Sequence, residues 1–189
     1  MRIFVNNSIL RFFRYNMPES ENCPMNKDSV YQTGASFTLP SWNEIPDVGL
    51  YLDQVTKYLN GFLKPFGMDV TPSMISNYVK LKIIPREGKK IYSRERIAAL
   101  IFVAVSKTVL SMDQIRTCLT IREEICTPEK GYSSFVRFLD AALGEDSSEP
   151  DDTGEEARAL LHTIAVAIAH KIRLDVYFRQ MEEAGRDVE

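Results

Sequence analysis

The sequence predicts a mainly helical domain, and three observations support that fold class. Apolar residues recur at the three- and four-residue spacing of a helix in several segments between residues 48 and 183. Two Thr-Pro pairs, Thr71-Pro72 and Thr127-Pro128, are strong helix starts, since threonine caps a helix and proline is tolerated at its first position. The hydrophobic content of 44% and the charged content of 26% are ordinary for a globular protein with a buried core.

Composition divides the 189 residues into four parts. Residues 1–37 are basic and then polar, and we expect a poorly ordered tail there because Asn, Ser, Pro and Gly accumulate. Residues 38–143 carry the predicted domain with its following helices, and residues 144–154 form an acidic linker. Residues 155–189 hold a last helix, to about residue 183, which packs on the domain or pairs with a second copy.

Two helices begin the domain. The first is expected from Val48, with Asp47 as its N-cap, and keeps helical spacing as far as Phe62. Glycine and proline between residues 61 and 67 then break the chain. The second helix is expected over residues 71–81. The pair forms a helix-turn-helix whose connection is longer than the usual 3–4 residues.

A short β-hairpin, the wing, is expected after the second helix. Pro85 forces the chain out of the helix, Gly88 stands at the tip of a turn, and Ile91-Tyr92 forms the returning strand. Ser93 then caps a third helix.

Further helices follow the third. Ser111 and Gln114 have the spacing of a capping box, and Thr127 starts another helix. The longest apolar run, nine residues over 97–105, is too short to span a bilayer, which takes about 20 residues in a helix. The three cysteines form no CxxC pair, so a reducing cytosol is the simplest compartment. The sequence thus predicts a cytoplasmic chain with additional C-terminal helices.

Charge is distributed unevenly along the chain. Between Thr71 and Lys107 there are eight bases and two acids, a net charge of +6. From Gly144 onward there are twelve acids and five bases, a net charge of −7. The formal net charge of −3 therefore hides two opposed regions.

The second helix has one polar face. At about 100° per residue, Ser73, Ser76, Asn77 and Lys80 share one sector of roughly 100° that contains no acid. Asparagine pairs bidentately with adenine, serine bonds a base or a phosphate, and lysine suits a phosphate. The opposite side is apolar and should pack on the core; it consists of Met74, Ile75, Tyr78, Val79 and Leu81.

The predicted wing carries most of the positive charge. Arg86, Lys89 and Lys90 lie on it, and Arg94 follows it. We expect Lys80, Arg86, Lys89 and Lys90 to hold the phosphates of DNA, which would make binding salt-dependent. Arg94 is expected to belong to the same DNA-binding set. The wing is thus the candidate for affinity and the helix face for specificity.

These residues resemble two families. VTPSMISNYVKLKIIP followed by KKIYSRERIAAL resembles the DNA-binding head of MerR-type regulators, in which a recognition helix precedes a wing and "Tyr-Ser" opens the next helix. The blocks WNEIP, LYLDQV and MISNYVK, in that order, resemble an uncharacterised bacterial family known as domain of unknown function 1836. The resemblance covers roughly residues 39–119. It implies a MerR-like winged helix-turn-helix, while the second family has no established function to carry over.

Other chemistry finds little support. His162 and His170 are eight residues apart, whereas metal pairs on helices favour a spacing of four. Cys118 and Cys126 are more simply core cysteines than a thiol sensor. No GxxxxGK[ST], GxGxxG or GxSxG motif is present. We therefore expect no enzyme, no metal and no cofactor.

The sequence thus predicts a DNA-binding transcriptional regulator. Its partner would be double-stranded DNA, and a homodimer is expected because operators are commonly two-fold. No membrane association is expected, and a small-molecule effector stays an open question. The alternative is a protein-interaction module that keeps this fold and binds an acidic partner, such as its own acidic segment, without binding DNA.

Overall fold

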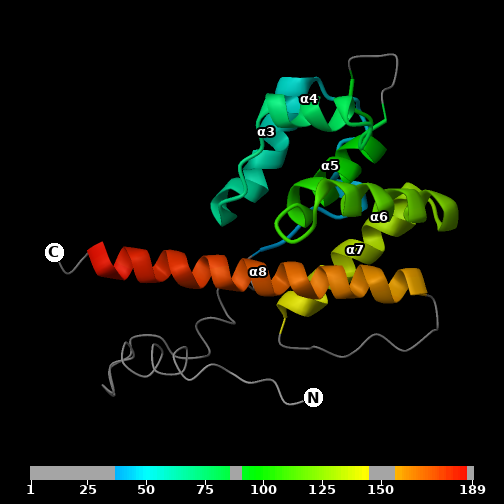
Figure 1. Cartoon of the computed structure of the whole chain (residues 1–189). Coiled ribbons are helices and arrows are strands. Elements are labelled where there is room, and N and C mark those ends of the chain that lie inside the picture. The colour runs from blue at the N-terminus through cyan, green and yellow to red at the C-terminus, as the bar shows by residue number, and fades with distance from the viewer. Residues whose placement is uncertain (1–36, 86–90, 145–155, 187–189) are drawn as a thin grey trace.

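The computed structural model describes residues 37–85, 91–144 and 156–186, with side chains as far as residue 180, and these residues are mainly helical (Figure 1). The elements, in chain order, are η1 (Trp42–Glu44), α3 (Leu52–Leu63), η2 (Lys64–Phe66), α4 (Pro72–Lys80), α5 (Arg94–Ser106), α6 (Met112–Ile125), α7 (Pro128–Leu143) and α8 (Glu156–Arg186). None of the described helices is long and apolar enough to cross a membrane.

Helix α5 forms the centre of the fold. Ten of its thirteen residues are buried, because the helix is apolar almost all round. It contacts α6, α7 and α8, and Figure 1 shows α3 and α4 on the opposite side of α5 from α8. The apolar run at residues 97–105 is therefore the central core helix.

Three helix starts agree with the predicted caps. The backbone N–H of Met74 donates to Thr71 Oγ1 at 3.2 Å, and that of Lys130 donates to Thr127 Oγ1 at 3.3 Å. Ser111 and Gln114 form the reciprocal capping box, with distances of 2.8 and 3.3 Å. These local hydrogen bonds satisfy N–H groups that a helix leaves unpaired at its first turn.

The first helix begins later than predicted. Helix α3 starts at Leu52 with Tyr51 as its N-cap, so the assignment of Asp47 as the cap was wrong. Leu50 is instead extended, since its N–H and C=O pair with the backbone of Tyr92 at 3.1 and 2.8 Å. Val48 is 68% exposed and does not belong to the buried stripe.

The predicted β-hairpin wing is not supported by the described residues, which contain one isolated bridge and no strand. Tyr92 pairs with Leu50, not with the residues that precede the turn. Ile83 and Ile84 are buried, and their N–H groups both donate to the carbonyl of Tyr78, at 3.0 and 3.3 Å. Because these donors close the end of α4, they are not available for a hairpin. Arg86, Lys89 and Lys90 lie outside the described residues.

Helix α8 packs along the domain. Its large buried apolar residues recur every four positions, and they are Ile164, Ile168, Ile172 and Val176. Ala165 and Ala169 are buried beside them. Arg173 Nη2 donates to the carbonyl of Ala142 at 2.8 Å, at the end of α7. Arg179 Nη1 donates to the carbonyl of Pro65 at 2.5 Å, in the connection between α3 and α4. One helix therefore contacts both the end of α7 and the turn before α4.

Candidate nucleic-acid interface

Helix α4 is fixed to the core by its apolar side. Ile75 is fully buried and Tyr78 is 5% exposed, while Met74 and Val79 are half-buried. Burial raises the pKa of the Tyr78 phenol, so this hydroxyl stays neutral at physiological pH. Leu81 departs from the prediction because it is 40% exposed, at the position where the helix has already ended.

The opposite side of α4 is polar and accessible. Ser73, Asn77 and Lys80 are exposed, and Ser76 is half-buried beside them. None of the nine residues of α4 is acidic. Within the described part of the chain, the side chains of Ser73, Asn77 and Lys80 have no hydrogen-bond partner, so their donors and acceptors are available to a ligand.

A side chain that the sequence analysis did not single out holds the entry to α4. Asn60 Nδ2 donates to the carbonyl of Val70 at 2.8 Å, and the N–H of Val70 donates to Asn60 Oδ1 at 2.9 Å. Val70 is only 1% exposed, so these bonds satisfy a buried peptide group. Thr71 follows directly and caps the helix. The amide of Asn60 thus fixes a connection that is too long for a standard tight turn.

Two further cations lie at the end of α4. Lys82 is exposed and adopts the left-handed conformation, with φ of 57°, which turns the chain out of the helix. Arg116 Nη2 on α6 donates to the carbonyl of Leu81 at 3.1 Å, and its Nη1 pairs with Asp113 at 2.6 Å. No sequence pattern pointed to Arg116, because it is 35 residues from Leu81 along the chain.

Arg94, which was predicted to contact DNA, instead makes contacts with residues near η1. Its Nε donates to the carbonyl of Ile45 at 3.0 Å, and its guanidinium lies 5.8 Å from the centroid of the Trp42 ring. Asp47 is 3.9 Å from its Nη2. These contacts favour a structural role for Arg94, and a DNA contact by this residue stays a prediction.

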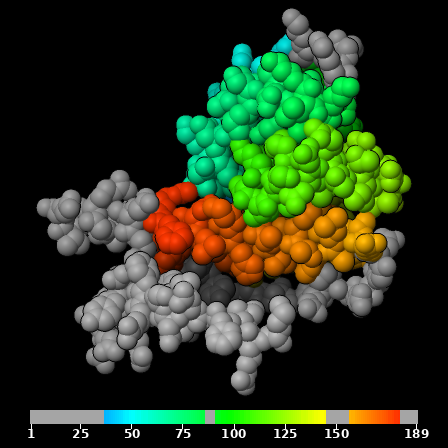
Figure 2. Space-filling view, in the orientation of Figure 1, coloured from blue at the N-terminus to red at the C-terminus, as the bar shows by residue number. Residues whose placement is uncertain are grey.

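The surface around α4 forms one end of the described molecule. Its residues are Ser73, Ser76, Asn77, Lys80, Lys82 and Arg116. Figure 2 shows the cyan and green elements, including α3 and α4, projecting from this end, with the orange α8 across the other. A projecting surface with short polar side chains and flanking cations can enter a groove of a polyanion.

The histidines and cysteines lie elsewhere. His162 packs edge-on against Phe138 with ring centroids 5.5 Å apart, and His170 is exposed. Within the described residues no group of three or more His, Cys, Asp or Glu side chains could hold a metal ion. Cys118 and Cys126 are free and partly buried, and burial raises the pKa of the Cys118 thiol. That shift is opposite to the shift that activates a thiol.

Comparison with known proteins places the chain in a family but gives it no activity. No curated protein and no solved structure matches it. The model of the family described as Domain of unknown function (DUF1836) matches residues 40–135, from just before η1 to the middle of α7. That range is 96 of the 189 residues and includes every described residue of the surface around α4. The chain therefore belongs to the family described as Domain of unknown function (DUF1836).

Proposed function

We propose that this protein is a DNA-binding transcriptional regulator in which α4 enters the major groove of double-stranded DNA. The observation that carries the proposal is the face of α4: Ser73, Asn77 and Lys80 are exposed, unpartnered within the described residues and free of neighbouring acids on that helix. An α-helix is about 10–12 Å across, which suits the roughly 12 Å width of the major groove.

The proposed roles follow from the chemistry of each side chain. Asn77 reads a base, since an amide pairs bidentately with adenine, and Ser73 and Ser76 contact bases or phosphates. Lys80 pairs with phosphate, and the structure adds Lys82 and Arg116 as neighbouring cations. We further propose that α4 docks on DNA as the recognition helix of MerR-type regulators does, and that the protein binds a two-fold operator as a homodimer in the cytoplasm.

Selection of binding sites from genomic DNA fragments by the purified full chain tests the proposal. We expect one enriched sequence, with an affinity that falls steeply as salt rises because released counterions drive phosphate contacts. Sequence preference should survive at salt concentrations that abolish non-specific binding. If no sequence is enriched even at about 50 mM salt, the regulator function is excluded.

Variants in and next to α4 separate base contacts from phosphate contacts. Asn77→Ala should relax the preference at one base pair by about 1–3 kcal/mol. Lys80→Gln with Lys82→Gln should weaken all sequences alike and reduce the salt slope by about one per lysine. Lys130→Gln on α7 is the matched control, since it removes an exposed lysine far along the chain from α4. If the control and the α4 variants change DNA binding equally, α4 is not part of the DNA interface.

The cations outside the described residues need their own test. Lys89→Glu with Lys90→Glu reverses two charges in the segment expected to clasp the DNA backbone. We expect a large loss of DNA affinity at low salt with the sequence preference retained. An unchanged affinity would show that this segment does not contact phosphate.

The alternative is that the same surface binds an acidic protein segment. The opposed charges of residues 71–107 and of the chain after residue 144 favour it. A synthetic peptide with the sequence EDSSEPDDTGEE distinguishes the two functions. Under the alternative, the protein binds the peptide and shows no preference for any DNA sequence. If the protein is a regulator, it prefers particular DNA sequences, and the acidic peptide does not substitute for them.

A further inference from the structure

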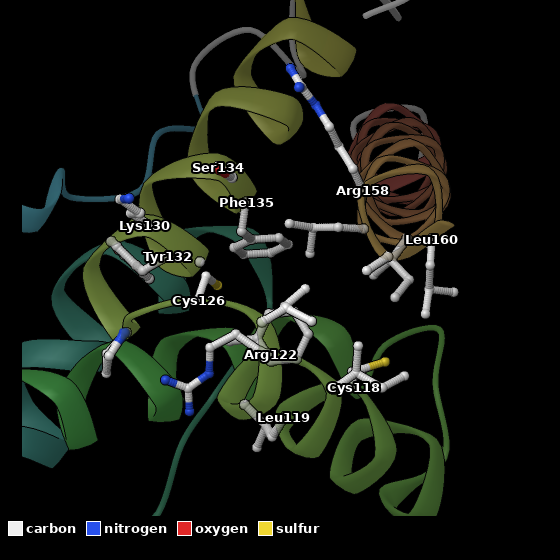
Figure 3. Close-up of a pocket in the computed structure, with 18 of the residues that line it drawn as sticks. Cys118, Leu119, Arg122, Cys126, Lys130, Tyr132, Ser134, Phe135, Arg158 and Leu160 are labelled. Atoms are coloured by element: carbon white, nitrogen blue, oxygen red, sulfur yellow. The ribbon is translucent and has the colours of Figure 1, made fainter. Parts of the chain in front are cut away.

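A cavity of about 650 Å³ lies between α5, α6, α7 and α8 (Figure 3). Figure 3 shows Cys118 and Leu119 of α6, Phe135 of α7 and Leu160 of α8 around one space. None of the described residues that line the cavity belongs to α3 or α4, so it is separate from the surface around α4. The volume falls within the range of about 300–1,000 Å³ that ligand pockets have in proteins. The cavity is therefore large enough for a small organic molecule.

The floor of the cavity is apolar and is held in place by the core. It consists of the six buried residues of the lining, which are Ala98 and Phe102 of α5, Tyr132, Phe135 and Phe138 of α7, and Ile164 of α8. Phe102 and Phe135 meet edge to face, with ring centroids 5.0 Å apart. Phe138 packs in the same way against His162, with centroids 5.5 Å apart. Because these rings fix one another, the shape of the floor does not depend on flexible side chains.

The floor offers no free polar group to a ligand. Its one polar side-chain atom is the hydroxyl of Tyr132, which donates to the carbonyl of Pro40 at 2.6 Å. Its backbone groups lie inside helices and pair there. Among the described residues of the lining, no buried side-chain nitrogen or oxygen lacks a hydrogen bond. An ionised group placed on this floor would therefore lose its hydration without gaining a partner.

The charged side chains of the lining lie at its rim. They carry both signs, and none of them is buried: Arg122, Lys130, Arg137 and Arg158 are basic, and Glu95 and Glu156 are acidic. Arg122 pairs with Glu123 at 3.3 Å. The guanidinium groups of Arg137 and Arg158 lie 5.2 and 5.8 Å from the centroid of the Phe138 ring. Because all six side chains reach water, the solvent screens their charges, and they do not need an ionic ligand to balance them.

We propose that this cavity binds a neutral organic molecule with a largely apolar body. The body would lie on the floor, where an aromatic ring can meet Phe102 or Phe135 edge to face. It would also cover Ile125 and Leu160 at the mouth, which are 58% and 40% exposed. Removing this apolar area from water stabilises the complex. The inference does not require that the protein bind DNA.

Calorimetric titration of the full chain with three probes that share one ring system tests the charge of the ligand. The probes are 2-naphthol, 2-naphthoate and 2-naphthylmethylammonium. At about pH 7 the first is neutral, because a phenol ionises at about pH 10, and the others are an anion and a cation. We expect 2-naphthol to bind at least about tenfold tighter than either ion, since only the ions lose hydration without a partner. Equal affinities, tighter binding of an ion, or no binding of 2-naphthol overturns the proposal.

A variant that fills the cavity tests the position of the ligand. Cys118 lines the cavity from α6 and is half-buried, so Cys118→Phe places a ring in the space and should weaken 2-naphthol binding at least about tenfold. Thr120→Phe is the matched control, because Thr120 lies on the same helix but is exposed and does not line the cavity. Urea denaturation shows that each variant is folded. If folded Cys118→Phe binds 2-naphthol as tightly as the unaltered protein, the ligand is not in this cavity.

Thiol labelling locates the ligand in the unaltered protein. Cys118 and Cys126 both line the cavity, and Figure 3 shows them on its α6 side. Saturating 2-naphthol should slow the alkylation of both by iodoacetamide, measured peptide by peptide, whereas 2-naphthoate at the same concentration should not. Alkylation at unchanged rates under saturating 2-naphthol would place the ligand elsewhere.

A second copy of the chain is the other occupant that an apolar mouth suits. If a copy covered the mouth, it would compete with the ligand, and the affinity for 2-naphthol would fall as the protein concentration rises. We expect an affinity that does not depend on protein concentration. A fall would overturn the proposal and identify the cavity as part of an interface between copies.

Discussion

The surface around α4 and the cavity between α5, α6, α7 and α8 differ in where their polar and charged side chains lie. On α4 the cations flank short polar side chains on an exposed helix face. At the cavity the charged side chains stay at the rim, and the buried floor is apolar apart from the paired hydroxyl of Tyr132. An exposed polar face meets the repeated phosphates of a duplex, whereas a concave apolar one encloses a single small neutral molecule. The position of the polar groups therefore separates the two proposed ligands.

Helix α8 connects these regions physically. Ile164 lines the cavity, and Arg179 of the same helix bonds the carbonyl of Pro65 in the connection before α4. The two residues are fifteen positions apart, about 22 Å along a helix that rises 1.5 Å per residue. Variants that act on one region alone are the way to show that the two sites are separate.

The largest effect is expected from Asn60→Ala, which should break the α4 region alone. The substitution leaves the buried N–H and C=O of Val70 without partners, so we expect a loss of about 2–3 kcal/mol in the free energy of unfolding. Urea denaturation measures this loss. DNA affinity should fall as well, because the entry to α4 is no longer fixed.

Asn77→Ala is the matched control for Asn60→Ala. It removes the same amide from an exposed position, so the stability should change by less than about 0.5 kcal/mol. The Asn60 variant should bind 2-naphthol normally under conditions where it is folded. Equal stability losses in the two variants would mean that the Asn60 bonds do not hold the turn.

A smaller effect is expected from the two threonine caps, which sharpen the comparison because one lies in each region. Thr71→Ala and Thr127→Ala each remove one hydrogen bond to a helix N–H, so each should cost about 1 kcal/mol of stability. Only Thr71→Ala should weaken DNA binding, and only Thr127→Ala should weaken 2-naphthol binding. Loss of both activities in either variant would show that the regions are coupled.

The smallest effect is expected from two helical glycines. A Cβ at Gly61 in α3 meets nothing within 4 Å, so Gly61→Ala should stabilise the protein by about 0.5–1 kcal/mol. A Cβ at Gly131 in α7 would lie 2.8 Å from Cγ of Arg122, which must move aside. Gly131→Ala should therefore gain less. Thermal unfolding of both variants checks the order, and a larger gain at Gly131 would contradict the close packing there.

Several features of the fold were predictable because they depend on neighbouring residues. Thr71, Ser111 and Thr127 mark helix starts through bonds to residues three positions away. The polar face of α4 follows from helical spacing alone. The start of the first helix was not predictable in the same way, since it depends on the pairing of Leu50 with Tyr92.

The sequence by itself determined the mainly helical class, the caps and the acid-free face of α4, because each arises from contacts within a few residues. Only the tertiary structure decided that Tyr92 pairs with Leu50, that Asn60 holds Val70 and that Arg116 lies beside Leu81. It also decided that Arg137 and Arg158 share one ring at the edge of a cavity. These contacts join residues up to 42 positions apart in the sequence. Burial of the core brings such distant residues together, and no local sequence pattern indicates which of them will meet.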